Sequence, residues 1–224
     1  MTIAAEGISA WMPAIAALAG IGGALGSQWL SHHFTAERER KAASEKLQRE
    51  QYFIATELVF QLERFGEECV PPATDYGDAE DGSGLAVLET SIPGIEFSGV
   101  KGDWRSLPSD LMYQIRELET MIAESRNVVS TAFDDADPPD FIEGFFAHRQ
   151  QAVRLGIRAF IIAARLRKLC KMPAMKGAGN SWSAPLHLWS QYREQRAIIF
   201  AARRTRVTRA FEITRLAHEK RHNY

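Results

Sequence analysis

The chain has 224 residues, of which 46% are hydrophobic and 25% are charged, and its formal net charge is −1. This composition excludes a disordered chain, and two cysteines exclude a scaffold built on disulfides. The charge is divided unevenly, because residues 1–137 carry 10 basic and 23 acidic side chains, whereas residues 138–224 carry 17 and five. Such asymmetry is typical of a basic interaction surface or of two halves that neutralise each other.

The first predicted element is a membrane-spanning helix. Residues 8–30 are 23 consecutive residues without a formal charge, and a helix of that length spans about 34 Å, enough for a bilayer core. Trp11 and Trp29 stand near its ends, as is typical of membrane interfaces. A signal peptide and a helix buried in a soluble domain are the alternatives, and the first lacks the usual basic residues ahead of the run. We therefore expect residues 1–34 to form a membrane anchor.

The charged residues that flank the run predict its orientation. Only Glu6 precedes it, whereas Arg38, Arg40 and Lys41 follow within about a dozen residues. Basic flanks stay in the cytoplasm, so the N-terminus is expected outside and the large C-terminal part inside.

Two glycines within the run predict a contact between membrane helices. Gly22 and Gly26 form a GxxxG pattern, whose small residues allow two helices to approach closely in lipid. The alternative is that glycine and alanine are simply frequent in this run. Homo-oligomerisation through the anchor is therefore a hypothesis.

Residues 35–224 are expected to form a cytoplasmic helical domain. Its first helix begins as a polar stalk over residues 35–46, enters the packed domain at Leu47 and ends before Pro71. Residues 71–84 carry four acidic residues, two prolines and three glycines, which predicts a flexible acidic loop. Residues 85–105 fit either a short hairpin or an irregular segment packed over the helices.

Three further helices are predicted, and the fold class is all-α. Their expected ranges are about 106–132, 138–171 with Asp137 as the N-terminal cap, and 186–218. The first of them carries a heptad stripe, typical of coiled-coil packing, formed by Leu111, Ile115, Leu118, Ile122, Ser125 and Val129. The architecture expected is an N-terminal transmembrane helix that continues into a bundle of long helices, with at most a minor hairpin near residues 85–105.

One catalytic motif occurs, at the C-terminal end. His218, Glu219 and His222 fit the HExxH pattern of zinc proteases. Only two residues follow it, so no downstream third ligand exists in the sequence, and Lys220 and Arg221 disfavour a dication there. We interpret it as a chance match on a solvated basic helix end, with adventitious metal binding as the alternative. The sequence thus predicts no catalytic, cofactor-binding or metal-binding residues, and a protein that is not an enzyme.

The last predicted helix carries a candidate basic surface, formed by Arg203, Arg204, Arg206 and Arg209. These side chains can pair with the acidic first half, contact anionic lipid headgroups, or contact nucleic-acid phosphates. The first interpretation needs no outside partner, and nucleic acid is the least favoured of the three. In residues 94–105, Trp104 is a candidate recognition residue, for which the alternative is a lid over the core.

The amino-acid sequences of two segments resemble those of a known family. The strings WLSHHFTAERERKAASEKLQREQYFIATELVFQLERF and VKGDWRSLPSDLMYQIREL resemble uncharacterised, prophage-encoded, membrane-anchored helical proteins of proteobacteria. The resemblance covers most of the chain and assigns no functional residue. It implies a bacterial inner-membrane location and a phage-related role, such as interference with other phages.

Together these features predict a non-enzymatic, single-span inner-membrane protein without cofactors. Its cytoplasmic helical domain is expected to bind an unidentified protein or a second copy of itself. The alternative function is phosphate binding, at a membrane surface or on nucleic acid, through the basic C-terminal helix.

Overall fold

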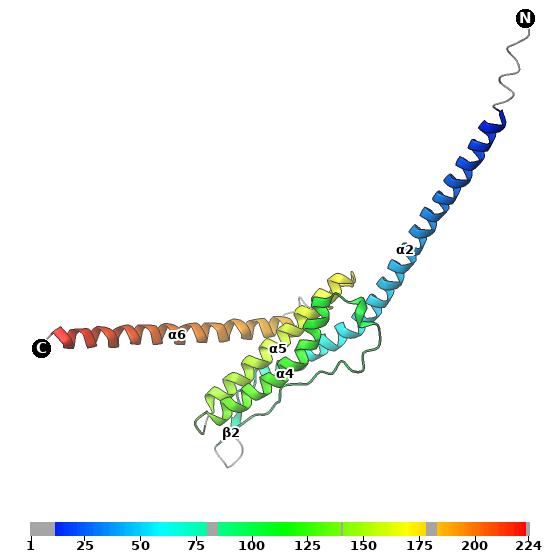
Figure 1. Cartoon of the computed structure of the whole chain (residues 1–224). Coiled ribbons are helices and arrows are strands. Elements are labelled where there is room, and N and C mark those ends of the chain that lie inside the picture. The colour runs from blue at the N-terminus through cyan, green and yellow to red at the C-terminus, as the bar shows by residue number, and fades with distance from the viewer. Residues whose placement is uncertain (1–11, 80–84, 140, 178–182, 223–224) are drawn as a thin grey trace, which may run out of the picture. The chain divides into compact units, whose positions relative to one another are not determined.

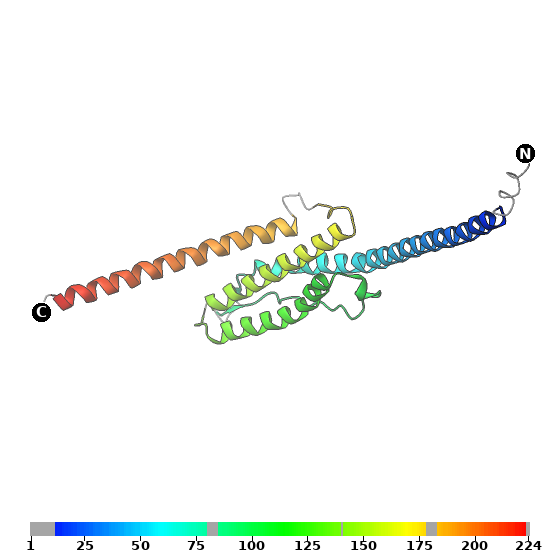
Figure 2. The same cartoon turned by 45° about the horizontal axis from the view of Figure 1, so that its top comes forward.

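The structure is a computed structural model that describes residues 12–79, 85–139, 141–177 and 183–222, with side chains at residue 35 and within 37–205. Most of the described chain is helical, which confirms the all-α class. The α-helices of the described chain are α2 (Met12–Glu68), α3 (Val70–Ala73), α4 (Ser109–Asp134), α5 (Ile142–Leu169) and α6 (Ala184–His222), and Figures 1 and 2 show how the long ones are arranged.

Helix α2 belongs to two compact units, Met1–Glu50 and Gln51–Tyr224. Its described side chains are exposed up to Glu50, and continuous burial starts at Ile54. Packing was expected to begin at about Leu47, which is 53% exposed, whereas the second compact unit begins four residues later, at Gln51. The polar stalk is longer than expected because packing starts only where partner segments are in reach: Gln51 Nε2 donates to the carbonyl oxygen of Ser106, 2.8 Å away.

Within the part of the chain that the structure describes, no helix is long and apolar enough to cross a membrane. The backbone of the predicted span is described only from residue 12 onward, and its side chains are not described. Residues 8–11 are not described, and neither are the side chains of residues 12–34, which include Gly22 and Gly26.

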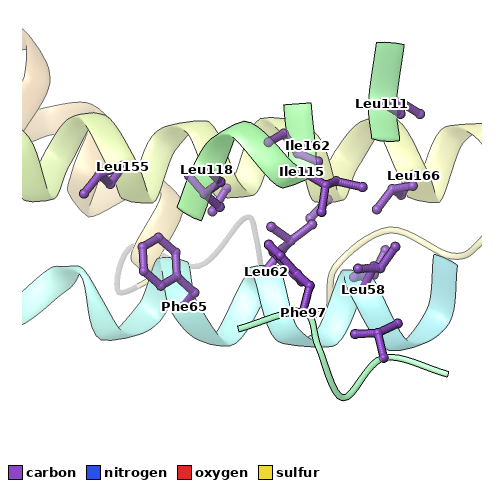
Figure 3. Packing of buried hydrophobic residues seen from close by; sticks show 14 of the residues in the cluster. Leu58, Leu62, Phe65, Phe97, Leu111, Ile115, Leu118, Leu155, Ile162 and Leu166 are labelled. Atoms are coloured by element: carbon purple, nitrogen blue, oxygen red, sulfur yellow. The ribbon is translucent and has the colours of Figure 1, made fainter. Parts of the chain in front are cut away.

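Helices α2, α4 and α5 bury one continuous apolar core (Figure 3). Leu62 and Phe65 on α2 meet Ile115 and Leu118 on α4, and all four are at most 2% exposed. The predicted heptad stripe of α4 is buried along its whole length. Its spacing keeps one face of the helix toward the core, and burying that face supplies the main driving force for packing.

Helices α4 and α5 lie side by side and antiparallel (Figures 1 and 2). Polar pairs at steps of seven or eight residues fix their register. They join Asp110 to Arg165 at 3.3 Å, Glu117 to Arg158 at 2.9 Å, and Ser125 to Gln151 at 3.1 Å. Because the residue numbers rise on one helix and fall on the other, a shift of either helix would separate all three pairs.

The segment predicted as a flexible acidic loop is partly structured. Pro71 and Pro72 lie in α3, where a missing N–H is tolerated in the first turn, and Ala73 is fully buried. The predicted hairpin lies elsewhere than expected: β1 (Asp78–Ala79) pairs antiparallel with β2 (Ala86–Val87), so it spans the acidic segment instead of residues 85–105. Residues 80–84 lie outside the described residues.

The chain from residue 88 to residue 103 is irregular, which was one of the two expected alternatives. It packs over α2 and α4 through Ile92, Phe97 and Val100, which are buried. Side chains of α4 satisfy its backbone: Glu119 accepts from the N–H of Phe97 at 3.0 Å, and an Arg126 nitrogen donates to the Ile92 carbonyl at 3.1 Å. Peptide groups without a strand partner are thereby bonded in the folded state.

Helix α5 begins later than predicted, at Ile142, and Asp137 is not its cap. Pro138 and Pro139 occupy a turn, and Phe141 precedes the helix with a left-handed φ of 44°. A residue followed by proline is disfavoured in the helical region, so two consecutive prolines delay the start of the helix.

Candidate functional site

The first three turns of α6 dock on α3 and α5. Leu188 is fully buried against an apolar cluster whose other members are Ala73, Ala152, Val153 and Ile157. Gly156 on α5 permits this approach, because a Cβ atom at that position would lie 2.6 Å from Leu188 Cδ1 and 2.9 Å from Cys69 Cβ. The docked part of α6 ends at Gln195, which is buried.

Beyond Gln195, α6 presents six consecutive apolar residues, 197–202, which we call the α6 apolar band. Ile198 is 51% exposed and Phe200 58%, and only Ile199 is half-buried. Arg196 precedes the band, with its guanidinium carbon 5.2 Å from the centroid of the Phe200 ring and a nitrogen 3.1 Å from the Tyr192 hydroxyl. The band is thus an exposed, helical, apolar surface next to an arginine.

The predicted basic surface is only partly within the described side chains. Arg203 and Arg204 are exposed on α6, whereas the side chains of Arg206 and Arg209 lie outside the described residues. Among the described residues, no carboxylate forms an ion pair with Arg193, Arg196 or Arg203. Arg193, Arg196 and Arg203 therefore differ from Arg158 and Arg165 of α5, which pair with carboxylates.

Internal neutralisation of the acidic half occurs on α5. Arg158 and Arg165 pair with carboxylates of α4, as described above. Arg167 forms a bidentate pair with Glu63 of α2, with N–O distances of 2.6 and 2.8 Å, and both side chains are largely buried. Part of the positive charge after residue 137 is thus neutralised within the bundle, by carboxylates of α2 and α4.

Trp104 is half-buried and packs against the core. Its ring meets Phe97 edge to face with the centroids 6.3 Å apart, and the Arg116 guanidinium lies 4.3 Å from its centroid. Asp103 accepts from the backbone N–H of Arg105 at 2.9 Å and fixes the turn that positions the indole. These contacts are those of a lid over the core, the alternative to a recognition residue.

A buried polar cluster joins the end of α3 to α5. Asp75 is buried, and its carboxylate accepts from Thr90 Oγ1 at 2.6 Å, from the Thr90 N–H at 2.8 Å and from the Gly77 N–H at 3.0 Å. Burial alone would raise the pKa of Asp75, but these hydrogen bonds and nearby His148 outweigh it and hold the pKa below its ordinary value. Asp75 is therefore ionised at neutral pH.

His148 on α5 is the second buried titratable group of this cluster, and it is 1% exposed. Burial lowers its pKa; Asp75 acts in the opposite direction, and Arg149 adds to the lowering. The sequence patterns considered above did not indicate this cluster. The available signal was a histidine within the apolar stripe of α5, three residues after Phe145 and four before Ala152.

Neither cysteine offers a reactive thiolate. Cys69 is buried and Cys170 half-buried, and both are free thiols. Burial raises the pKa of the Cys69 thiol, with a smaller contribution from Glu68, and burial also raises the pKa of Cys170. A thiol whose pKa is raised is protonated at neutral pH and is a weak nucleophile.

The HExxH residues 218–222 lie at the end of α6, and their side chains are outside the described part. Among the side chains that are described, no group of three or more His, Cys, Asp or Glu is placed to hold a metal ion.

Two open grooves occur on the described surface. A groove of about 570 Å³ between α4 and α5 is bordered by Glu117 and Arg158, which pair with each other. A groove of about 760 Å³ lies between α2 and the segment after α5, bordered by Phe60 and by the Glu63–Arg167 pair. The charges that pair at each groove neutralise one another, so neither groove resembles a site prepared for a charged substrate.

The chain matches no protein-family model, and comparisons with curated proteins and with solved structures give no match either. The resemblance to prophage-encoded membrane proteins therefore stays a prediction.

Proposed function

We propose that the protein is a non-enzymatic, single-span membrane protein whose cytoplasmic helical domain binds another protein through α6. The observation that carries this proposal is the α6 apolar band. Its residues Ile198 and Phe200 are exposed in the part of α6 that lies beyond the contact with α3 and α5. A helix segment that is apolar on all sides is normally buried, because apolar area in water is unfavourable. A partner that covers residues 197–202 would remove this area from water.

The residue types around the band favour a protein partner. Aromatic residues and arginine are enriched at the energetically important centres of protein interfaces. Phe200 and Arg196 form such a pair, with 5.2 Å between the ring centroid and the guanidinium carbon. A phosphate surface would use the arginines but would leave the six apolar residues without a role.

Photo-crosslinking in cells tests this contact directly. A photoreactive amino acid in place of Phe200 is expected to give a crosslinked adduct of defined mass, and Ile198→Ser in the same chain to abolish it. The matched control carries the same photoreactive residue in place of Tyr113, which is 65% exposed on α4 and outside the band. Equal adducts at both positions, or none at position 200, would contradict the proposed contact.

The second candidate function is binding of anionic phosphate groups. It is favoured by Arg193 and Arg203, which form no ion pair with a carboxylate among the described residues. Retention of the full chain, kept in detergent micelles, on immobilised phosphatidylglycerol and on duplex DNA tests this function at low and high salt.

The variant for these assays replaces Arg203, Arg204, Arg206 and Arg209 by Gln. If phosphate binding is the function, retention is lost while the helical circular dichroism is unchanged. A control variant replaces the exposed Arg49 and Arg64 of α2 by Gln and should be retained. Unfolding of the fourfold variant would instead indicate that these arginines neutralise the acidic half.

The proposed membrane location is supported by the uncharged run of residues 8–30 and by the basic residues that follow it. Placement in a bacterial inner membrane and a prophage accessory role, such as interference with other phages, rest on the resemblance alone. Close packing at Gly22 and Gly26 would give homo-oligomers through the anchor.

Cell fractionation with a reporter fused to the C-terminus tests the location. The chain is expected in the membrane fraction after a high-salt wash, with the reporter in the cytoplasm. Leu18→Arg with Ile21→Arg should move it to the soluble fraction, because each central charge raises the free energy of insertion by about 2.5–3.5 kcal/mol. Recovery of the unaltered chain in the soluble fraction would rule out the anchor.

A further inference from the structure

Helix α5 holds a buried imidazole with one unpaired ring nitrogen. His148 is 1% exposed, and its Nε2 atom is buried without a hydrogen-bond partner in the part of the chain that the structure describes. A neutral imidazole carries one donor and one acceptor, whereas the protonated ring carries two donors and a charge. Without water or an acceptor nearby, the charged ring is far more costly to bury than the neutral one.

The charged groups around His148 come from two elements. From the turn after α3, the Asp75 carboxylate attracts a proton on the imidazole, but its oxygens already accept three hydrogen bonds from Gly77 and Thr90. From α5 itself, the Arg149 guanidinium opposes protonation.

Arg149 also ties this turn to α5. One of its nitrogens donates to the Asp75 carbonyl oxygen at 3.1 Å, and its guanidinium carbon lies 4.1 Å from the centroid of the Tyr76 ring. Glu194 of α6 acts on Arg149 electrostatically. The repelling guanidinium is therefore held in place beside the imidazole.

We propose that His148 is a pH-sensitive lock on the turn of residues 74–79, which we call the Asp75 turn. While the imidazole is neutral, the turn stays closed over α5. Once the ring is protonated, the Asp75 carboxylate turns toward it. This movement removes the acceptor from the backbone N–H groups of Gly77 and Thr90, so the turn opens.

The sign of the pH dependence follows from burial. The closed state disfavours the charged ring, so the pKa of His148 lies below its ordinary value when the turn is closed. The stability of the closed turn is therefore complete above the ordinary histidine pKa of about 6.5 and decreases as the pH falls below it. Asp75 loses its own contribution only at lower pH, below the ordinary aspartate range.

Amide hydrogen exchange of the full chain, kept in detergent micelles, tests the lock at pH 7.5 and 5.5. After correction for intrinsic exchange, the protection of Gly77 and Thr90 should fall by up to about tenfold per pH unit below the ordinary histidine pKa, as expected for uptake of one proton. The amide of Leu118 in the core should keep its protection. In His148→Gln, the protection of Gly77 and Thr90 should be the same at both pH values.

The control variant is His187→Gln, which removes a half-buried histidine of α6 and should retain the pH dependence. The lock is refuted if the protection of Gly77 and Thr90 is independent of pH, if Leu118 loses protection to the same degree, or if His148→Gln keeps the wild-type behaviour. Should His148→Gln fail to fold, NMR titration of the wild-type ring decides. A His148 pKa below the ordinary value supports the lock, and one at or above it overturns it.

Discussion

Replacing Arg167 by Ala should destabilise the helical bundle by about 3–5 kcal/mol, the range for a buried charge that loses its partner. The change removes both hydrogen bonds to Glu63, at 2.6 and 2.8 Å, and leaves that carboxylate in a site where only 11% of its side chain is exposed. It also removes the bond from Arg167 to the Pro173 carbonyl. Urea denaturation followed by circular dichroism measures the loss.

The chain offers a matched control for this prediction on α2, the helix that carries Glu63. Arg64 pairs with Glu68 at 3.0 Å, but the two side chains are 81% and 45% exposed. Arg64→Ala should therefore change stability by no more than about 1 kcal/mol. Equal losses for the two variants would show that burial does not set the strength of the Glu63–Arg167 pair.

A double replacement separates the pair from the packing around it. In Glu63→Met with Arg167→Met, no uncompensated charge remains, and the long apolar side chains fill a similar volume. Such replacements of buried ion pairs are often neutral or stabilising. We therefore expect the double variant to be more stable than Arg167→Ala, whereas equal instability would indicate that the pair is needed for α2 and α5 to pack.

The parts of the fold that depend on one helix alone could be predicted from the sequence. The stripe of α4 repeats over six positions from Leu111 to Val129, and every one of them is buried. The point where α2 enters the core could not be predicted in this way. Leu47 continues the apolar pattern of α2, but it is exposed. The segments that cover α2 begin to contact this helix only at Gln51.

The Asp75 cluster was beyond the reach of sequence patterns for a similar reason. The hydrogen bond from Arg149 to the Asp75 carbonyl joins residues 74 positions apart, and Thr90 reaches the carboxylate from 15 positions away. Within α5 alone, His148 is merely a polar residue in an apolar stripe. Only the fold shows that a carboxylate and a guanidinium act on it.

The sequence predicted the basic character of the α6 surface but not its exposed apolar residues. The excess of basic residues after residue 137 indicated a cationic helix, and Arg203 is indeed exposed. The six apolar residues 197–202 would by themselves predict burial, since apolar runs are normally inside. Their exposure depends on where α6 leaves α5, which the docking of Leu188 and the buried Gln195 determine.

Replacing Gly77 by Ala should open the Asp75 turn even at neutral pH. Gly77 has φ of 74°, and a Cβ atom there would overlap with Phe145 Cζ. The left-handed backbone costs an alanine about 1–2 kcal/mol, and an overpacked site costs about 1–3 kcal/mol. A loss of about 2–5 kcal/mol in the stability of the turn is therefore expected, measured as faster amide exchange at Thr90.

Gly177→Ala is the control that separates the cost of the left-handed backbone from the cost of overpacking. Gly177 has a similar φ of 84°, but among the described residues, its chain neighbours apart, no atom lies within 4 Å of the position its Cβ would take. Only the backbone term of about 1–2 kcal/mol applies there. If Gly77→Ala and Gly177→Ala cause the same loss of stability, the Phe145 ring moves aside without a free-energy cost. The steric argument for Gly77 is then wrong.

The Phe145 contact can also be tested by a double-mutant cycle. Phe145→Leu shortens the side chain that faces Gly77, so its combination with Gly77→Ala should be less destabilising than the sum of the single changes. If the losses of stability are additive, the Phe145 ring makes no steric contact with the side chain introduced at position 77. Because Gly77→Ala removes the closed state in which His148 is buried, the exchange of Thr90 in this variant should also lose its dependence on pH. That result would connect the backbone of Gly77, the ring of Phe145 and the proton on His148 to a single opening of the turn.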